Sequence, residues 1–301
     1  MIAHSINSLI VFVNNFDCHN HSIFSDGLLK PRDLIELAKK SGCDAIALTD
    51  HDNTGGLAEA EAAAAQLCVR FIRGVELSVT WPDKLSSAAA ADINPITIHV
   101  VGLGIDPHEP ALVSGIASIR DGRLDRARQM GAHLAGLGMK GVFEEAWLLA
   151  ENKDMIGRTH FARAIVARGL AKNVGAVFGR FLTPGKPGFV AHQWANLNAA
   201  IDWINGAGGV AVLAHPGRYK LSGQEIRCLL TEFKQNGGRA IEVITGSHEK
   251  HQYREFAVLA REFDFMASRG SDFHGAGESR FQPGTLPLLP TDLVPVWSVL
   301  Q

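Results

Sequence analysis

The chain has 301 residues, of which 46% are hydrophobic and 20% are charged, and its formal net charge is −2. This length and apolar content allow a sizeable core in one large domain or two ordinary ones, and they exclude a disordered protein. The near-neutral net charge argues against a protein that binds nucleic acid over its whole surface, although a local basic patch is still compatible with it.

Two features bear on location. The four cysteines are widely spaced without a C-x-x-C pair, which is typical of reduced thiols in a cytosolic protein. Residues 1–15 contain only a brief apolar run and no lysine or arginine, unlike a secretory signal, and no uncharged run approaches membrane-spanning length. We therefore expect a cytoplasmic protein that does not enter the membrane, and nothing in the sequence indicates an obligate protein partner.

Short apolar runs alternate with helical patterns in the first hundred residues. Pro31 opens one predicted helix, and an alanine-rich stretch at 56–67 predicts a second. The Ser/Ala-rich stretch at 86–91 predicts a surface loop. The apolar runs predict strands at residues 9–13, 45–48, 71–76 and 96–102.

The pattern changes between residues 106 and 190, where we predict helices and no strand. Pro110 opens a long amphipathic helix, with apolar residues on one side and arginines in its later turns. Further helices are expected at 143–149 and 159–167, followed by a Gly/Pro-rich loop at 182–188. We predict that residues 106–190 form a helical insertion between the first part (14–105) and the second part (191–301) of one domain. We expect this insertion to cap the substrate site.

Strand–helix alternation resumes after the insertion. A helix is expected at 198–205, and strands at 210–213, 240–244 and 265–268. Seven strands with helices between most of them predict an α/β fold with a largely parallel sheet closed into a barrel. In such barrels chemistry collects at the carboxyl ends of the strands.

Metal-binding types of side chain recur at those strand ends. The two imidazoles of His19 and His21 lie two residues apart on an extended segment and therefore point to one face, whereas Cys18 points to the other. Carboxylates that converge on one place would repel one another, and bound cations relieve that repulsion. A ligand set of imidazoles and carboxylates without thiolate favours Mn²⁺, Zn²⁺ or Fe²⁺. The predicted ligands are His19, His21, Asp26, His51, Glu76, His99, His215, Asp272 and His274.

Simpler roles compete for some of these residues. His99, taken alone, fits a half-buried histidine that closes a strand; Asp50 fits a helix N-cap, and Asp26 a turn before Gly27. Four other histidines lack such a context, and we expect them at the surface: His4, His108, His133 and His248.

The ordered motifs resemble those of the PHP (polymerase and histidinol phosphatase) phosphoesterases over nearly the whole chain. The matching segments are Asp17-x-His19-x-His21 with Ser25-Asp26-Gly27, Thr49-Asp50-His51-Asp52, Gly74-Val75-Glu76, Ala214-His215-Pro216 and Ser271-Asp272-x-His274. The resemblance implies a distorted (β/α)₇ barrel that holds two or three divalent ions, with Mn²⁺ expected.

The resemblance also implies how the ligands divide. One ion would be held by His19, His21, Glu76 and Asp272; a second would share Glu76 and add His99 and His215; a third would take Asp26, His51 and His274. A metal-bridging hydroxide held by Glu76, Asp272 and His274 would attack phosphorus.

Four further segments are Ile98-His99-Val100-Val101-Gly102-Leu103-Gly104-Ile105-Asp106, Arg158-Thr159-His160-Phe161-Ala162-Arg163, Leu182-Thr183-Pro184-Gly185-Lys186-Pro187-Gly188-Phe189-Val190 and His215-Pro216-Gly217-Arg218-Tyr219. They resemble the branch that includes 3′,5′-nucleoside bisphosphate phosphatases and 5′→3′ exoribonucleases. The branch implies hydrolysis of the 3′-phosphate of a bisphosphonucleotide, or exonucleolytic cutting of a 5′-phosphorylated oligonucleotide at the same site; a nucleotide-sensing module without catalysis is the third hypothesis. Predicted substrate-binding residues are Arg123, Arg126, Arg158, Lys186, His192 and Arg218, with Trp194 beside His192 as a stacking surface for a base. For Arg123 and Arg126, a solvated helix face is the alternative.

Overall fold

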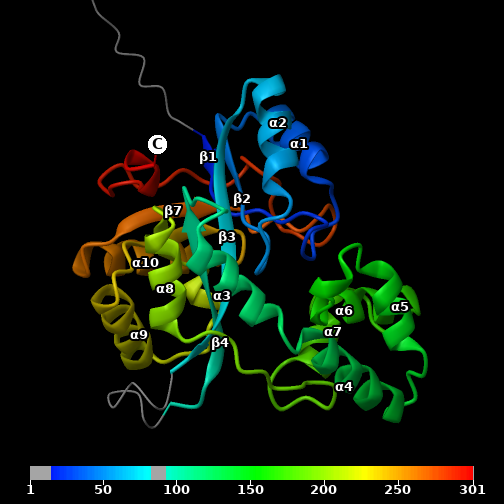
Figure 1. Cartoon of the computed structure of the whole chain (residues 1–301). Coiled ribbons are helices and arrows are strands. Elements are labelled where there is room, and N and C mark those ends of the chain that lie inside the picture. The colour runs from blue at the N-terminus through cyan, green and yellow to red at the C-terminus, as the bar shows by residue number, and fades with distance from the viewer. Residues whose placement is uncertain (1–14, 83–92, 301) are drawn as a thin grey trace, which may run out of the picture.

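The structure is a computed structural model, and it describes residues 15–82 and 93–300. Seven strands form one sheet in chain order (Figure 1). They are β1 (Phe16–Asp17), β2 (Ala45–Leu48), β3 (Arg70–Trp81), β4 (Ile96–Leu103), β5 (Val210–Leu213), β6 (Ala240–Thr245) and β7 (Met266–Gly270). The Cys18 N–H donates to the carbonyl of Arg269 at 2.8 Å, so the first strand returns to the last and the sheet nearly closes into a barrel.

The predicted α/β barrel is therefore confirmed, with one difference in strand direction. β4 runs antiparallel to both β3 and β5, whereas the other neighbouring strands are parallel. β3 also continues to Trp81, which pairs with Ile96, so Glu76 lies within a strand and not at its end. The strand expected at 9–13 and the loop expected at 86–91 lie outside the described residues.

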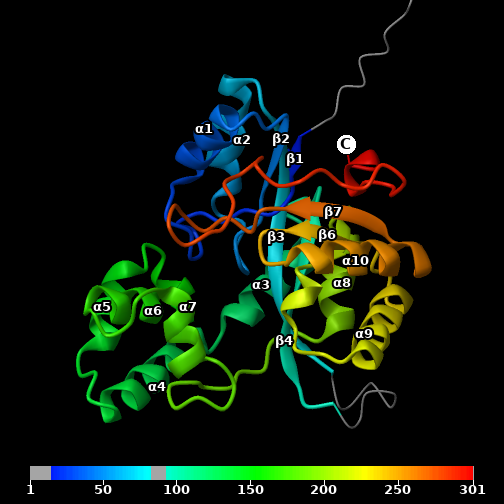
Figure 2. The same ribbon diagram turned by 180° about the vertical axis from the view of Figure 1, so that it is seen from behind.

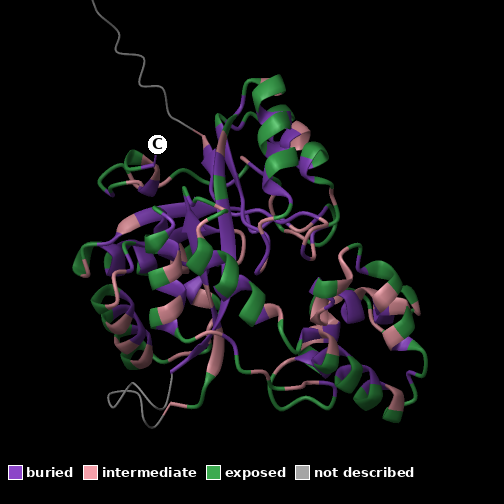
Figure 3. Cartoon of the chain, in the orientation of Figure 1, coloured by how far each residue is buried: buried purple, intermediate pink, exposed green. Residues whose placement is uncertain are grey.

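Helices pack around the outside of the barrel (Figures 1 and 2). They are α1 (Pro31–Lys40), α2 (Leu57–Leu67), α3 (Pro110–Arg120), α8 (Leu197–Gly206), α9 (Gly223–Gln235) and α10 (Lys250–Glu262), with short 3₁₀ turns η4 (Pro216–Arg218) and η5 (Val296–Ser298). α1 illustrates why they form: Pro31 occupies its first turn, and Leu34, Ile35 and Ala38 recur on its buried face. The sheet is almost wholly buried beneath them (Figure 3).

A helical lobe, which we define as residues 123–182, lies beside the barrel (Figure 1). It comprises α4 (Arg123–Gly136), α5 (Val142–Leu149), η2 (Lys153–Met155), α6 (Arg158–Ala167), α7 (Val174–Val177) and the π-helical turn η3 (Phe178–Leu182). The lobe has a hydrophobic cluster of its own, which includes Met130, Phe161 and Ile165. It can therefore hold its shape independently of the barrel core.

The prediction of a single long helix from Pro110 is wrong. The chain breaks between α3 and α4 at Gly122, whose φ of +77° suits glycine. Leu112 and Ile116 of α3 join the barrel cluster, whereas α4 belongs to the lobe. The predicted division into residues 14–105, 106–190 and 191–301 stays a prediction. The break between the helix of the barrel and the first helix of the lobe lies at Gly122.

Across residues 15–82 and 93–300, no helix is both long enough and apolar enough to cross a membrane.

Candidate metal centre and substrate cavity

Four predicted ligands from three strands converge: His19 and His21 follow β1, Glu76 lies in β3, and Asp272 follows β7. The Nε2 atoms of His19 and His21 lie 3.1 Å apart. Both face Glu76 Oε2, at 3.3 and 3.4 Å, and both face Asp272 Oδ1, at 3.6 and 3.3 Å. Two lone-pair nitrogens and two carboxylate oxygens directed at one point form a suitable divalent-metal cage.

Glu76 is the hub of the whole cluster. Its carboxylate is fully buried, and its Oε2 also lies 2.8 Å from His51 Nδ1. On the other side, Oε1 lies 2.9 Å from His99 Nδ1 and 3.0 Å from His215 Nε2. One carboxylate thus faces imidazoles from several strands, which suits a ligand shared by two ions.

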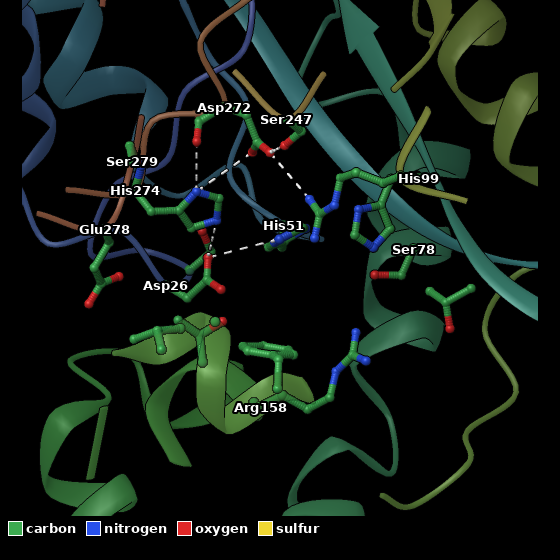
Figure 4. Close-up of a pocket in the computed structure, with 18 of the residues that line it drawn as sticks. Asp26, His51, Ser78, His99, Arg158, Ser247, Asp272, His274, Glu278 and Ser279 are labelled. Atoms are coloured by element: carbon green, nitrogen blue, oxygen red, sulfur yellow. Dashed lines mark hydrogen bonds and ion pairs between the residues drawn. The ribbon is translucent and has the colours of Figure 1, made fainter. Parts of the chain in front are cut away.

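A third group lies nearer the cavity (Figure 4). Asp26 Oδ1 is 3.3 Å from His274 Nε2 and 3.9 Å from His51 Nε2. Donor atoms of these three residues and of His21 all lie within 4.8 Å of one another. All nine predicted ligands therefore surround one space, which we call the basin.

The hydrogen bonding of the buried polar atoms shows whether divalent cations fit this basin. Some buried atoms lie close to charged neighbours but make no contact with hydrogen-bond geometry among the described residues; they include Asp26 Oδ1, His51 Nδ1, Glu76 Oε2 and Asp272 Oδ1. Such atoms cost free energy unless something satisfies them. Three are carboxylate oxygens and one is an imidazole nitrogen, and all four face the basin, so the donor set fits divalent cations.

Glu242 supports the ligands from behind, and sequence reasoning missed it. Its Oε1 accepts from His19 Nδ1 at 2.9 Å, and its Oε2 accepts from the His215 N–H at 2.6 Å. A carboxylate on the rear nitrogen fixes the tautomer that directs His19 Nε2 into the basin. A lone glutamate inside the apolar strand 240–244 was the available signal, since a buried carboxylate needs such partners.

Other polar side chains hold the ligand loops. Asp50 accepts hydrogen bonds from Ser22, through its N–H at 2.8 Å and its hydroxyl at 2.6 Å, and from the Ser25 hydroxyl at 2.6 Å. It therefore braces the loop that carries Asp26, and the N-cap alternative for Asp50 is wrong because Gly56 precedes α2.

Two ligands have strained backbones. His215 has a φ of +28° and Asp272 a φ of +54°, a region that residues other than glycine rarely adopt. Asp272 is held in that conformation through Oδ2, which accepts from the Ser247 hydroxyl at 2.7 Å and from Arg218 at 3.2 Å. Its Oδ1 is thereby left to face His19 and His21.

The electrostatics hold Glu76 and His215 in the forms that bind metal, whereas at His274 the carboxylate of Asp26 outweighs burial and raises the pKa to about 9. Burial opposes ionisation of Glu76, but the imidazoles of His51 and His99 outweigh it and hold the pKa of this carboxyl well below its usual range. Burial, with Arg218 nearby, lowers the pKa of His215 to about 3. An ionised carboxylate and a neutral imidazole are the forms that coordinate cations.

A cavity of about 620 Å³ separates the basin from the helical lobe. Asp26, His51, His99 and His274 line its barrel side, and Arg158 lies across from them on the lobe side (Figure 4). This volume falls in the range of small-molecule sites.

Arg123 and Arg126 are buried at the cavity edge, so the solvated-face alternative is wrong for both. Arg123 pairs with the buried carboxylate of Asp52. Arg126 Nε donates to the carbonyl of Val190 at 3.0 Å, and it has no carboxylate partner in the described chain. Both guanidinium groups lie over the Trp194 ring, at 4.7 and 5.4 Å from its centroid.

Arg158 has no hydrogen bond or ion pair to any described residue, and its guanidinium lies over the Phe178 ring. Burial, with Arg218 and Arg123 nearby, lowers its pKa to about 10. Burial, with Arg158 and Arg123 nearby, likewise lowers the pKa of Arg126 to about 9. An anion would relieve this crowding of positive charge.

Other predicted residues lie elsewhere. Lys186 is exposed and His192 half-buried, and neither lines the cavity as the described residues form it; their substrate role stays a prediction.

His108 and His133 are exposed, as expected, and His4 is not among the described residues. The surface prediction for His248 is wrong, because this ring is fully buried and accepts from the Gly217 N–H at 2.9 Å.

Comparison with known sequences gives consistent matches. A family model described as the PHP domain matches residues 17–243. A 3′,5′-nucleoside bisphosphate phosphatase from Chromobacterium violaceum is 48% identical over 287 residues, which cover 95% of this chain and 96% of that protein. A 5′-3′ exoribonuclease from Haemophilus influenzae is 36% identical over 287 residues, covering 94% and 97%.

Solved structures give the same picture. An amidohydrolase from Chromobacterium violaceum, solved with bound sulfate and no metal, superposes with a TM-score of 0.88 at 48% identity over 94% of this chain and 95% of that one. A protein from Bifidobacterium adolescentis described as a metal-dependent phosphoesterase superposes with a TM-score of 0.76 at 25% identity, again over 94% and 95%.

Proposed function

Since the chain belongs to the PHP-domain family, we propose that it is a metal-dependent phosphoesterase that hydrolyses the 3′-phosphate of 3′,5′-bisphosphonucleotides. One observation carries this proposal: a single cavity has a metal-type basin on its barrel side and uncompensated arginines on its lobe side. A substrate with two phosphates would place one group on each side. The relative that is 48% identical and named for this activity supports the same assignment.

The nine basin residues would hold two or three divalent ions, and we propose Mn²⁺. The first site would use His19, His21, Glu76 and Asp272; the second Glu76, His99 and His215; the third Asp26, His51 and His274. When bound, such ions lower the pKa of coordinated water and neutralise charge that develops on phosphoryl oxygens.

The chain's own residues would orient the reaction. Glu76, Asp272 and His274 surround the place where we put the attacking water, on the floor of the cavity. Arg218 lies beside Asp272 and would contact the phosphate that is cleaved. The substrate would reach the basin through the cavity that lies between it and the lobe.

Arg126 and Arg158 would bind the phosphate that is retained. Neither has a carboxylate partner within the described chain, and both line the cavity. Guanidinium groups bind phosphate in bidentate fashion. Arg123 is less available, because Asp52 already neutralises it.

Exonuclease activity on 5′-phosphorylated oligonucleotides is the second candidate. It is favoured by the 36% identity to a 5′-3′ exoribonuclease. It needs the same chemistry, with the 5′-nucleotide leaving through its 3′-oxygen in both cases, but at a phosphodiester whose phosphorus carries the rest of the chain. A sensing module without catalysis is disfavoured, because all nine ligand positions are occupied by ligand residues.

The test is a direct comparison of substrates. Protein loaded with Mn²⁺ is incubated with adenosine 3′,5′-bisphosphate and with a 5′-phosphorylated oligoribonucleotide, and kcat/KM is measured for release of phosphate and of mononucleotide. We expect the bisphosphate to give the higher kcat/KM. A higher value for the oligonucleotide would favour the exonuclease, and inertness toward both would support the sensing module.

A further inference from the structure

An apolar strip crosses the lobe side of the cavity, and phosphate binding does not explain it. Met155 of η2, Val174 of α7 and Phe178 of η3 all line the cavity. They come from three separate segments of the lobe, whereas polar and charged residues dominate the barrel side. An apolar strip beside a phosphate site suggests a ligand with a flat apolar part.

Phe178 lies between buried residues of the lobe. It opens the π-helical turn, in which the Thr183 N–H donates to the Phe178 carbonyl at 3.2 Å. Val177 before it and Leu182 after it are fully buried in the lobe cluster. Wide turns of this kind are frequent at functional sites, and this one presents an aromatic ring to the cavity.

Phe178 also adjoins the proposed phosphate site. The Arg158 guanidinium lies over its ring, with Cζ 5.5 Å from the centroid. A group bound to Arg158 is therefore within reach of the ring. In a nucleotide, the 5′-phosphate and the base are attached to the same sugar, so neighbouring sites for phosphate and base are what such a ligand requires.

Trp194 is a poorer stacking surface, although its sequence context suggested that role. Two guanidinium groups lie over its ring, those of Arg123 and Arg126, whereas one lies over the ring of Phe178. Its indole N–H donates to the Thr97 hydroxyl at 3.2 Å, and the whole residue is only 8% exposed. Trp194 thus braces the arginines from within.

We propose that Phe178 is the platform on which the nucleobase stacks, with Met155 and Val174 completing the apolar wall. The proposal rests on the proposed function, because it assumes a nucleotide in this cavity. The ring offers no hydrogen bond, and every base has a π-face, so the platform distinguishes nucleotides from sugar phosphates but accepts all bases.

The experiment compares a substrate with a base and one without. Wild-type and Phe178→Ala proteins, both loaded with Mn²⁺, are assayed with adenosine 3′,5′-bisphosphate and with the abasic 1-deoxyribose 3,5-bisphosphate. Stacking on one aromatic ring predicts that Phe178→Ala lowers kcat/KM for the nucleotide by roughly tenfold and for the abasic compound by less than about twofold. Phe178→Trp should keep the nucleotide rate.

Two further variants keep the result interpretable. Phe178→Leu preserves apolar volume but removes the π-face, so it should resemble Phe178→Ala even if the latter is less stable. Leu148→Ala, on an exposed side of the lobe, should change neither rate. Equal losses for both substrates in the Phe178 variants, or equal wild-type rates with and without the base, would overturn the platform. Inertness of the wild type toward all phosphate esters would instead overturn the proposed function.

Discussion

The two sides of the cavity are built differently. On the barrel side, two of the predicted ligands have further contacts that fix them: His19 has Glu242 behind it, and Asp272 has Ser247 and Arg218. On the lobe side, Arg158 lies against one aromatic ring and Arg126 bonds to one carbonyl. The barrel side is thus preorganised, whereas the lobe side is left with unsatisfied charge for a ligand to complete.

Physical chemistry explains the difference. Buried carboxylates and imidazoles are stable only where partners surround them, and metal chemistry tolerates little displacement of a ligand. Phosphate recognition by arginine depends on charge and on a fork of donors, which still functions when the group shifts slightly. Changes on the barrel side should therefore affect metal binding and kcat, and changes on the lobe side should affect KM.

The largest effect is expected from Glu76→Gln. This substitution removes the charge that faces five imidazoles and leaves a buried amide in its place. We expect bound Mn²⁺ to fall and kcat/KM for the bisphosphate to drop on the order of 10³-fold. Elemental analysis and steady-state assays measure the two quantities; normal metal content with normal activity would contradict the role of Glu76 as hub.

A smaller effect on the same side is expected from Glu242→Gln. The amide can accept only one of the two hydrogen bonds that Glu242 now accepts, and its NH₂ would oppose His19 Nδ1–H. Loss of such a rear partner lowers metal affinity by roughly 10–100-fold. Activity titrated against Mn²⁺ should show this shift, with kcat largely restored at saturation.

Glu61→Gln is the matched control for that experiment. Glu61 pairs with Arg73 at 2.7 Å on the exposed surface, far from the cavity residues. The Mn²⁺ titration of Glu61→Gln should superpose on that of the wild type. If Glu242→Gln also superposed, the barrel side would not depend on rear partners, and the contrast between the two sides would fail.

On the lobe side, Arg158→Ala should raise KM for the bisphosphate by roughly 10–100-fold while kcat changes little, because a charge-assisted contact to the retained phosphate is lost. For a 3′-mononucleotide, which lacks that phosphate, the variant should behave like the wild type. Arg180→Ala, an exposed arginine that does not line the cavity as described, is the control. A fall in kcat alone would place Arg158 in the chemical step.

The smallest effect is expected from Arg163→Ala, which removes a link between the two sides. Arg163 of α6 donates to Glu278 at 2.7 and 2.8 Å and to the Asp26 carbonyl at 2.7 Å. We expect the free energy of unfolding to fall by about 1–2 kcal/mol and KM to rise roughly threefold. Thermal unfolding and kinetics measure these changes; Arg227→Ala, which breaks the exposed pair with Glu262, should leave KM unchanged.

The amino-acid sequence alone determined the alternation of strands and helices and which side chains are candidate ligands. Apolar runs followed by His-x-His, Thr-Asp-His-Asp or Ser-Asp-x-His are local patterns, and the carboxyl ends of neighbouring parallel strands must meet at one edge of a sheet. That rule brings residues as distant as His19 and Asp272 together without knowledge of the fold in detail. Glu76 fitted the rule only in part, since it lies inside β3.

Only the tertiary structure decided the partners of these residues. The direction of β4, the break at Gly122, the burial of His248, the position of Glu242 behind His19 and the neutralisation of Arg123 by Asp52 all depend on segments far apart in the chain. The physical reason is that a side chain's local neighbours set its secondary structure, whereas its charge state, burial and contacts are set by whatever packs against it from elsewhere in the fold.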